Sequence, residues 1–411
     1  MYQYIKSQRP PFFARMVMVL LLLSPILQCY GWGKFDFSFI AMSLLAVCHL
    51  VIHGIRKTKV PYSFFIYFGW WYISHLLSSN SIGEFLPLGL IKIAITYIMY
   101  IDLFDLDYFM KKYKKIAGFI IAYFYIQELG QLLVGVHLPS FVSFLPFAVT
   151  DNAQEYIQAS IESERSSSLF KETAVFAQFL LPLLCYELLE NKQKKNWTYI
   201  IFLTITLLWS RAGNAMIGLI VLSICYGISI LKFQQGFKKV VYIVLGASMA
   251  IGGLTVFMRT EGGQKVLDRA STIGIEETLD KGYANSTFMR IYQGYYIFDE
   301  FSEFYKLVGN DHDSYIQNRA YASPVMSALY RNFDFVTYFN AFQHVLIYTG
   351  YIGVFLIFLL FSGIWKGNTF CGKSMLTVLI ALSLISSNFF NAIMALYLLP
   401  AIGFKENNIT K

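Results

Sequence analysis

The sequence predicts an all-α polytopic membrane protein with about 11 to 12 transmembrane helices. Hydrophobic residues make up 56% of the 411 residues and charged residues only 14%, against roughly 25% charged residues in a soluble domain. The mean hydropathy is +0.51, and apolar runs of about 20 residues, the length of a helix that crosses a bilayer, recur along the chain. These observations exclude a soluble enzyme, a nucleic-acid-binding domain and a disulfide-rich secreted scaffold.

The apolar runs define the predicted spans in chain order. They lie near residues 16–31, 36–54, 61–79, 85–104, 116–137, 172–190, 197–210, 214–231, 240–258, 343–364 and 374–401. Polar residues, among them Ser386, Ser387 and Asn391, interrupt the last stretch. It is therefore either one tilted helix, which leaves the C-terminus outside, or two short segments that return the C-terminus to the cytoplasm.

Basic residues mark the predicted cytoplasmic face. Lys6, Arg9 and Arg15 precede the first span, and the even-numbered connections carry further Lys and Arg residues. This positive-inside pattern predicts a cytoplasmic N-terminus and accounts for the net charge of +8 without a nucleic-acid partner. The predicted parts are helices one to five (1–137), a first outer loop (138–171), helices six to nine (172–258), a large outer loop (259–338) and the C-terminal helices (339–411).

The two long outer loops are the expected place of function, because long loops on a helical scaffold commonly hold binding and catalytic groups. The large loop mixes tyrosines, phenylalanines, arginines and acids. Residues 288–304 place apolar side chains at helical spacing, so we expect helices in this loop that lie at the membrane surface.

The first candidate cluster lies directly before the sixth predicted span. Arg165 is followed by three serines and then by Glu172. An arginine at the N-terminus of an outward-facing helix favours an anion, since free backbone N–H groups and the helix dipole act together. The alternative is an ordinary interfacial cap made by Ser168 or Thr173.

The second candidate cluster runs from Arg290 to Phe298 in the large loop. Arg290 and Gly294 share a helical face. Because Gly294 has no side chain, another group could approach the helix closely beside the arginine. A guanidinium there suits a diphosphate, and Tyr292 and Tyr295 suit stacking on sugar rings. An aromatic interfacial helix with one solvated arginine is the alternative.

The third candidate cluster is Ser210-Arg211-Ala212-Gly213-Asn214, a very tight outer turn between the seventh and eighth spans. Gly213 and Asn214 suit the turn itself. Arg211 is expected at the membrane surface, pointing into the cavity that the helices enclose.

The sequence contains no pattern typical of a metal or cofactor site. The five cysteines lie in or beside predicted spans and are expected to be packing residues. Asp311-His312-Asp313 looks like an Asp-x-Asp pair for a divalent ion, but such triplets are common in polar loops. No metal and no cofactor are therefore expected.

The order of these clusters resembles the Wzy-type O-antigen polymerases of Gram-negative bacteria, within the polymerase and ligase superfamily. The residues that carry the resemblance are the segments 165–172, 210–213, 290–296 and 338–353. The last segment contains Asn340, His344, Gly350 and Gly353. Gly309-Asn310-Asp311 departs from the Gly-x-Gly that is common in relatives.

The resemblance implies a metal-independent glycosyltransferase of the GT-C type in the bacterial inner membrane. It would join oligosaccharide repeat units linked to undecaprenyl diphosphate at the periplasmic face, so its partners would be that donor and acceptor, membrane lipid and a polysaccharide chain-length regulator. Arg165 and Arg290 would stabilise the leaving diphosphate with help from Arg211. Glu172 is the first candidate for the general base, and His344 and Asp311 are the alternative candidates. Asn340, His344, Tyr292 and Tyr295 are the further candidates for substrate contacts.

Two alternatives remain open at this point. An O-antigen ligase shares the architecture and usually relies on an outer-loop histidine, for which His312 and His344 are available. A lipid-linked oligosaccharide flippase or transporter would also have about a dozen helices, but it should concentrate charge within spans and show internal repeats.

Overall fold

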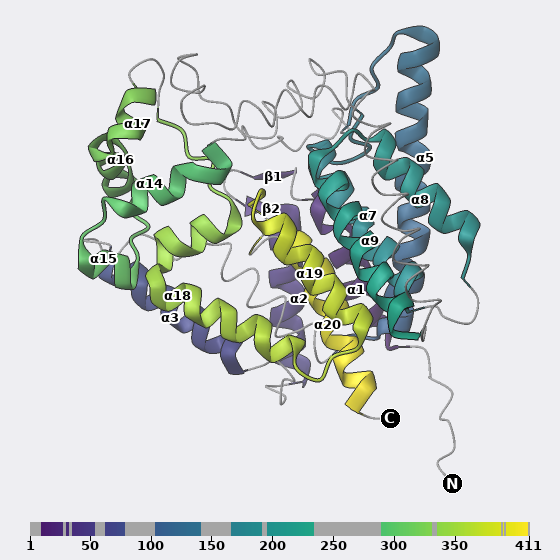
Figure 1. Cartoon of the computed structure of the whole chain (residues 1–411). Helices are drawn as coiled ribbons and strands as arrows, with labels where there is room; N and C mark the ends of the chain where they lie inside the picture. Colours follow the sequence, from purple (N-terminus) through teal and green to yellow (C-terminus); the bar gives the residue numbers. More distant parts are fainter. Residues whose placement is uncertain are drawn as a thin grey trace.

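The described part of the protein is almost entirely helical (Figure 1). The computed structural model describes residues 10–27, 30–32, 35–53, 62–78, 103–140, 166–190, 195–233, 289–330, 335–387, 389 and 392–409. Its helices are α1 (Phe12–Leu27), α2 (Phe37–His53), α3 (Tyr62–Ser78), α5 (Leu106–Val134), α7 (Thr173–Leu189), α8 (Trp197–Trp209), α9 (Gly213–Phe233), the π-helical turn η1 (Met289–Gln293), α14 (Gly294–Asp299), α15 (Glu303–Val308), α16 (Asp313–Ala322), α17 (Pro324–Leu329), α18 (Ala341–Trp365), α19 (Phe370–Ser383) and α20 (Ala392–Ile409). The strands β1 (Gly31–Trp32) and β2 (Phe35–Asp36) form a short antiparallel pair between α1 and α2.

Three described helices are long and apolar enough to cross a membrane, namely α5, α9 over Gly213–Leu231, and α18. Shorter apolar helices accompany them at Phe12–Leu27, Ile40–His49, Thr173–Leu189, Trp197–Trp209, Phe370–Ser383 and Ala392–Lys405. The predicted all-α architecture is confirmed for the described residues, and the three candidate spans are consistent with the predicted membrane character. The predicted span 240–258 and nearly all of the span 85–104 lie outside the described residues.

Several predicted boundaries differ from the structure; α1, for example, begins at Phe12 rather than near residue 16. Helix α5 begins at Leu106 rather than near residue 116, because Asp105 caps it by accepting a hydrogen bond from the Tyr108 N–H at 2.8 Å. The basic residues that were expected in a connection are therefore helical, and Lys114 pairs with the buried carboxylate of Glu187 at 3.0 Å. The last hydrophobic stretch is two helices, α19 and α20.

The described part of the large loop folds into a small helical unit with its own core. Met289, Ile297, Phe301, Ile316 and Met326 are buried together in it. Figure 1 shows α14 to α17 gathered at one side of the molecule, with α15 against the first half of α18 and α3 alongside α18. The expectation that this loop contains helices is therefore confirmed for residues 289–330.

Two glycines allow α15 to end against the middle of α18. Gly309 and Gly350 both have positive φ, 85° and 63°, and Gly350 breaks the helical geometry of α18. A Cβ on Gly350 would lie 2.4 Å from the Leu307 carbonyl oxygen. The Asn310 N–H donates to the Ile347 carbonyl at 2.7 Å, so the kink supplies a backbone acceptor to the loop unit.

We expect Gly350→Ala to lower the free energy of unfolding by at least about 2 kcal/mol, because it adds a clash to an unfavourable φ. Gly367→Ala is the matched control, since Gly367 has φ of 75° but no atom within 4 Å of an added Cβ. Thermal unfolding of both purified variants in detergent measures the difference. Equal losses of Tm would contradict the close contact between α15 and α18.

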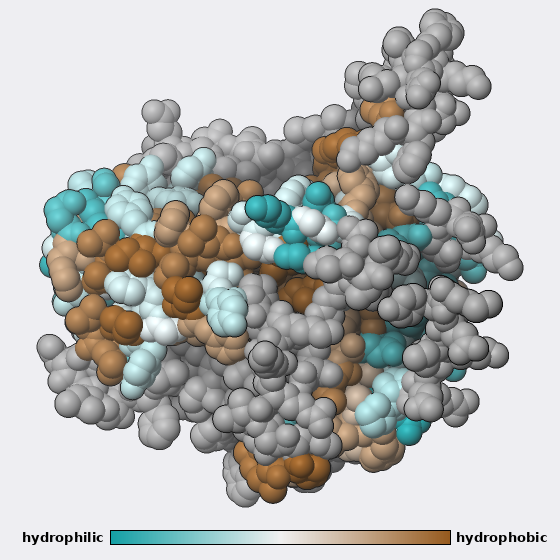
Figure 2. Space-filling model, turned by 90° about the horizontal axis from the view of Figure 1, so that it is seen from below, coloured by the Kyte–Doolittle hydropathy of each residue, from teal (hydrophilic) through white to brown (hydrophobic). Residues whose placement is uncertain are grey.

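Large apolar side chains are exposed along the predicted spans. They include Phe119, Leu132, Phe355 and Phe358, and Phe358 is 68% exposed. Figure 2 shows hydrophobic residues in brown over much of the described face, with hydrophilic residues in teal gathered in separate areas. Such exposure is costly in water and suits contact with lipid chains.

Candidate functional site

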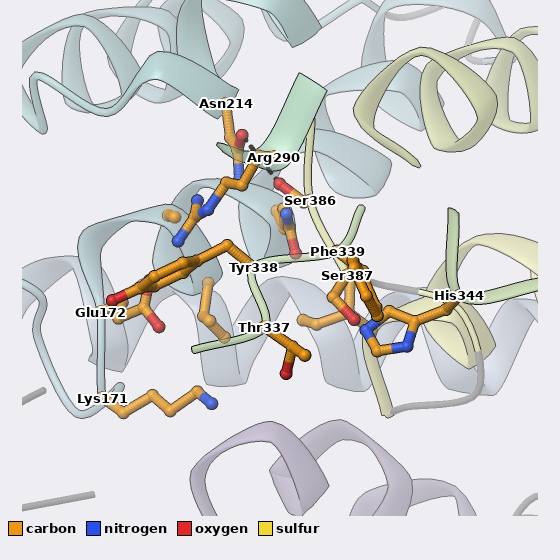
Figure 3. Close-up of a pocket in the computed structure, with 14 residues that line it drawn as sticks. Lys171, Glu172, Asn214, Arg290, Thr337, Tyr338, Phe339, His344, Ser386 and Ser387 are labelled. Atoms are coloured by element: carbon orange, nitrogen blue, oxygen red, sulfur yellow. Dashed lines mark hydrogen bonds between the residues drawn. The ribbon is translucent and has the colours of Figure 1, made fainter. Parts of the chain in front are cut away.

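A cavity of about 360 Å³ lies where the loop unit meets the helical bundle (Figure 3). It is lined by Lys171, Glu172, Ala174, Val175, Gln178, Asn214, Arg290, Thr337, Tyr338, Phe339, His344, Ser386, Ser387 and Ile393. These residues come from α7, the start of α9, η1, the segment before α18 and its first turn, and the break between α19 and α20 with the start of α20. Three of the predicted site residues, Glu172, Arg290 and His344, therefore share one cavity.

The N-terminus of α7 forms one wall of the cavity. Glu172 is the N-cap residue, and its side chain makes no capping hydrogen bond. The preceding serines are buried, and Ser168 binds α5: its Oγ donates to the Ile120 carbonyl at 2.7 Å, and its N–H donates to Gln127 at 2.8 Å. Ser167 Oγ donates to Ser140 Oγ at 2.7 Å. Neither Ser168 nor Thr173 caps the helix. The serines therefore anchor the turn that presents Lys171 and Glu172.

Arg290 comes from the π-helical turn η1, which α18 holds in place. The Asn340 side-chain amide donates to the Arg290 carbonyl at 2.8 Å, and Gln343 donates to the Ile291 carbonyl at 2.8 Å. A Cβ on Gly294 would meet Gln343 at 2.6 Å. The close approach that Gly294 permits is thus the packing of α18 against η1.

Gln293 positions the segment that carries Tyr338. Its side chain is fully buried, donates to the Val336 carbonyl at 2.7 Å and accepts from the Tyr338 N–H at 2.7 Å. It also donates to the Tyr330 hydroxyl, and burial raises the pKa of this phenol. In Figure 3 the ring of Tyr338 lies between the guanidinium of Arg290 and Glu172.

Asn214 and Ser386 form a neutral polar wall. Ser386 Oγ donates to Asn214 Oδ1 at 3.1 Å, and the Ser386 carbonyl accepts from the Ala341 N–H at 3.0 Å. Asn214 is 5% exposed, and its Nδ2 is buried without a hydrogen-bond partner among the described residues. A buried amide N–H without an acceptor is costly, so this group suits a ligand oxygen.

His344 lies on the side of the cavity opposite Glu172 in Figure 3. Its ring stacks edge-on against Phe339 and Tyr348, with centroid distances of 5.5 and 5.2 Å. Asp311, the other alternative candidate for the base, does not line the cavity. Its two carboxylate oxygens bind His75 at 2.5 Å and Ser78 at 2.6 Å, so it joins α3 to the loop unit.

The remaining predicted residues lie away from the cavity or outside the described residues. Arg165 is outside them. Arg211 is exposed, has a positive φ of 53° and does not line the cavity. From the same turn, Asn214 lines the cavity instead. Tyr292 packs on the core of the loop unit, and Tyr295 is 46% exposed.

Asn340 is buried, and both ends of its amide serve the protein itself. It caps α18 by accepting from the Gln343 N–H at 2.9 Å and donates to the Arg290 carbonyl. Sequence reasoning did not select Lys171, Gln178, Asn214, Tyr338, Ser386 or Ser387. The polar interruption of the last apolar stretch was the signal for Ser386 and Ser387, and the tight turn after Trp209 was the signal for Asn214.

The cavity combines groups for an anion with a carboxylate. The positive end of the α7 dipole, Lys171 and Arg290 favour bound negative charge, while Glu172 is available as a proton acceptor. The described residues hold no cluster of three or more His, Cys, Asp or Glu side chains that would bind a metal ion. Comparisons with protein-family models, with curated proteins and with solved structures find no match to this chain.

Proposed function

We propose that this protein is an inner-membrane polysaccharide polymerase that joins undecaprenyl-diphosphate-linked repeat units at the periplasmic face. The observation that carries the proposal is the convergence of Arg290, Lys171 and Glu172 on one cavity at the helix N-terminus of α7. A lipid diphosphate supplies the anion that this cavity suits, and a sugar hydroxyl supplies the proton for Glu172. The exposed apolar helices suit a substrate with a long lipid tail.

The proposed reaction transfers a glycosyl group directly between two lipid-linked sugars. The Glu172 carboxylate accepts the proton of an acceptor hydroxyl, whose oxygen attacks the anomeric carbon of the donor. The bond between that carbon and the diphosphate oxygen breaks, and undecaprenyl diphosphate leaves with the electron pair. Arg290 and Lys171 stabilise the charge that grows on the leaving diphosphate. Asn214 Nδ2, which has no hydrogen-bond partner among the described residues, donates to a substrate oxygen.

The ligase is the second candidate, because His344 also lines the cavity. A ligase would use its histidine on the hydroxyl of a lipid A-core acceptor. The flippase is a different class of protein, because it would need a path through the membrane for the whole oligosaccharide.

The test is the pattern of surface polysaccharide in a strain from which this gene has been deleted. Loss of a polymerase leaves single repeat units on the lipid A-core, and the wild-type gene restores a ladder of longer chains. A deletion strain that makes no surface glycan at all would favour the flippase. Polymer stranded on the carrier lipid would favour the ligase.

A further inference from the structure

A second cavity lies between α1, α2 and the start of α5, and it shares no lining residue with the candidate site. This groove has a volume of about 620 Å³. Apolar side chains line most of it, including Val19 and Leu23 of α1 and Leu44 of α2, whereas Arg15 and Tyr108 supply its polar groups. The lining residues of α1 extend from Phe12 to Leu23, about 16 Å along a helix axis. The groove is therefore an elongated apolar trough with polar groups toward one end.

The polar end of the groove is positively charged. Arg15 lies in the first turn of α1, with its guanidinium 5.7 Å from the ring centre of Phe12. Its Nε is buried and has no hydrogen-bond partner among the described residues. Lys112 of α5 does not line the groove itself, but it places a second cation beside it, because its Nζ lies 5.5 Å from the ring centre of the lining residue Tyr108.

The carboxylate at the start of α5 is bound to the backbone of that helix. Asp105 accepts the Tyr108 N–H and caps the helix. Arg15 and Lys112 form no ion pair with a carboxylate among the described residues, so both charges are available to a bound anion.

We propose that this groove binds an anionic phospholipid, with one acyl chain along α1 and α2 and the headgroup phosphate on Arg15 and Lys112. The apolar trough matches a hydrocarbon chain. Phe12, Met16 and Leu44, which line it, are 69%, 43% and 63% exposed, and such exposed apolar surface suits contact with lipid rather than water. Basic residues close to a membrane surface favour anionic lipid by about 1 kcal/mol each. A zwitterionic lipid gains less, since its cationic headgroup offsets its phosphate. This proposal is independent of the glycosyltransferase proposal.

Native mass spectrometry of the purified full-length chain in detergent tests the site. The protein is titrated separately with phosphatidylglycerol and with phosphatidylcholine, and the two lipids have identical acyl chains. We expect wild type to prefer phosphatidylglycerol, and Arg15→Gln to reduce that preference about fivefold, the factor for about 1 kcal/mol. Lys112→Gln, as a second variant, should also reduce the preference for phosphatidylglycerol. Lys306→Gln should not, because Lys306 lies in the loop unit and is already paired with Glu303.

Filling the trough tests the acyl-chain half of the proposal. Ala41 lines the groove from α2, so Ala41→Phe should weaken both lipids while the Tm without added lipid stays within a few degrees of wild type. Equal affinity of wild type for both lipids would overturn the proposal. So would an unchanged preference in both Arg15→Gln and Lys112→Gln.

Discussion

Arg290→Ala is expected to reduce polymer formation by at least about 100-fold, leaving single repeat units on the lipid A-core. Removing one donor that stabilises transition-state charge typically costs a factor of about 100 to 1,000, and Arg290 is the guanidinium that the described residues place in the cavity. Gel analysis of surface polysaccharide from the complemented deletion strain measures the effect, with membrane levels of each variant checked by immunoblot.

Two further variants sharpen the interpretation of Arg290. Arg290→Lys keeps the charge but loses the two-pronged geometry, so we expect an intermediate ladder. Lys306→Ala is the control from the same loop unit, because Lys306 forms an exposed ion pair with Glu303 at 3.1 Å that contributes little. A full ladder from Arg290→Ala at normal expression would show that the cavity is not the catalytic centre.

Glu172→Gln is expected to lower the polymerisation rate by about 100-fold to 10,000-fold, the usual contribution of a general base. The amide keeps the shape of the side chain and its place before α7, but it cannot accept the proton. Because Glu172 makes no capping hydrogen bond, the variant should unfold at nearly the wild-type temperature. The measurement is the time course of ladder growth after induction of each variant.

Glu303→Gln is the matched control for the base, since its carboxylate is 91% exposed in the same loop unit as Arg290. It should retain the wild-type rate. If Glu172→Gln kept normal chain length and rate while Arg290→Ala abolished polymer, the base assignment would be wrong and the diphosphate assignment would stand. His344→Ala would then be the next variant, because His344 lines the same cavity.

The sequence predicted the helices well where hydrophobicity is continuous. Helices α2, α3 and α8 begin and end within a residue or two of their predicted spans. The start of α5 was missed because four lysines in its first turns resemble a connection, whereas an N-cap aspartate and a buried carboxylate partner extend the helix to Leu106. The sequence left open whether the last stretch is one helix or two, because Ser386, Ser387 and Asn391 interrupt it, and the structure shows two helices, α19 and α20.

The sequence by itself determined the all-α membrane architecture and the clusters that contain Glu172, Asn214 and Arg290. These follow from local properties, namely the length of apolar runs and the residue types at their ends. Only the tertiary structure decided which side chains converge. It placed Asn214 rather than Arg211 in the cavity and made Asn340 a support for Arg290. Such choices depend on backbone direction at a tight turn and on contacts between residues about 50 apart in the chain, which no local pattern encodes.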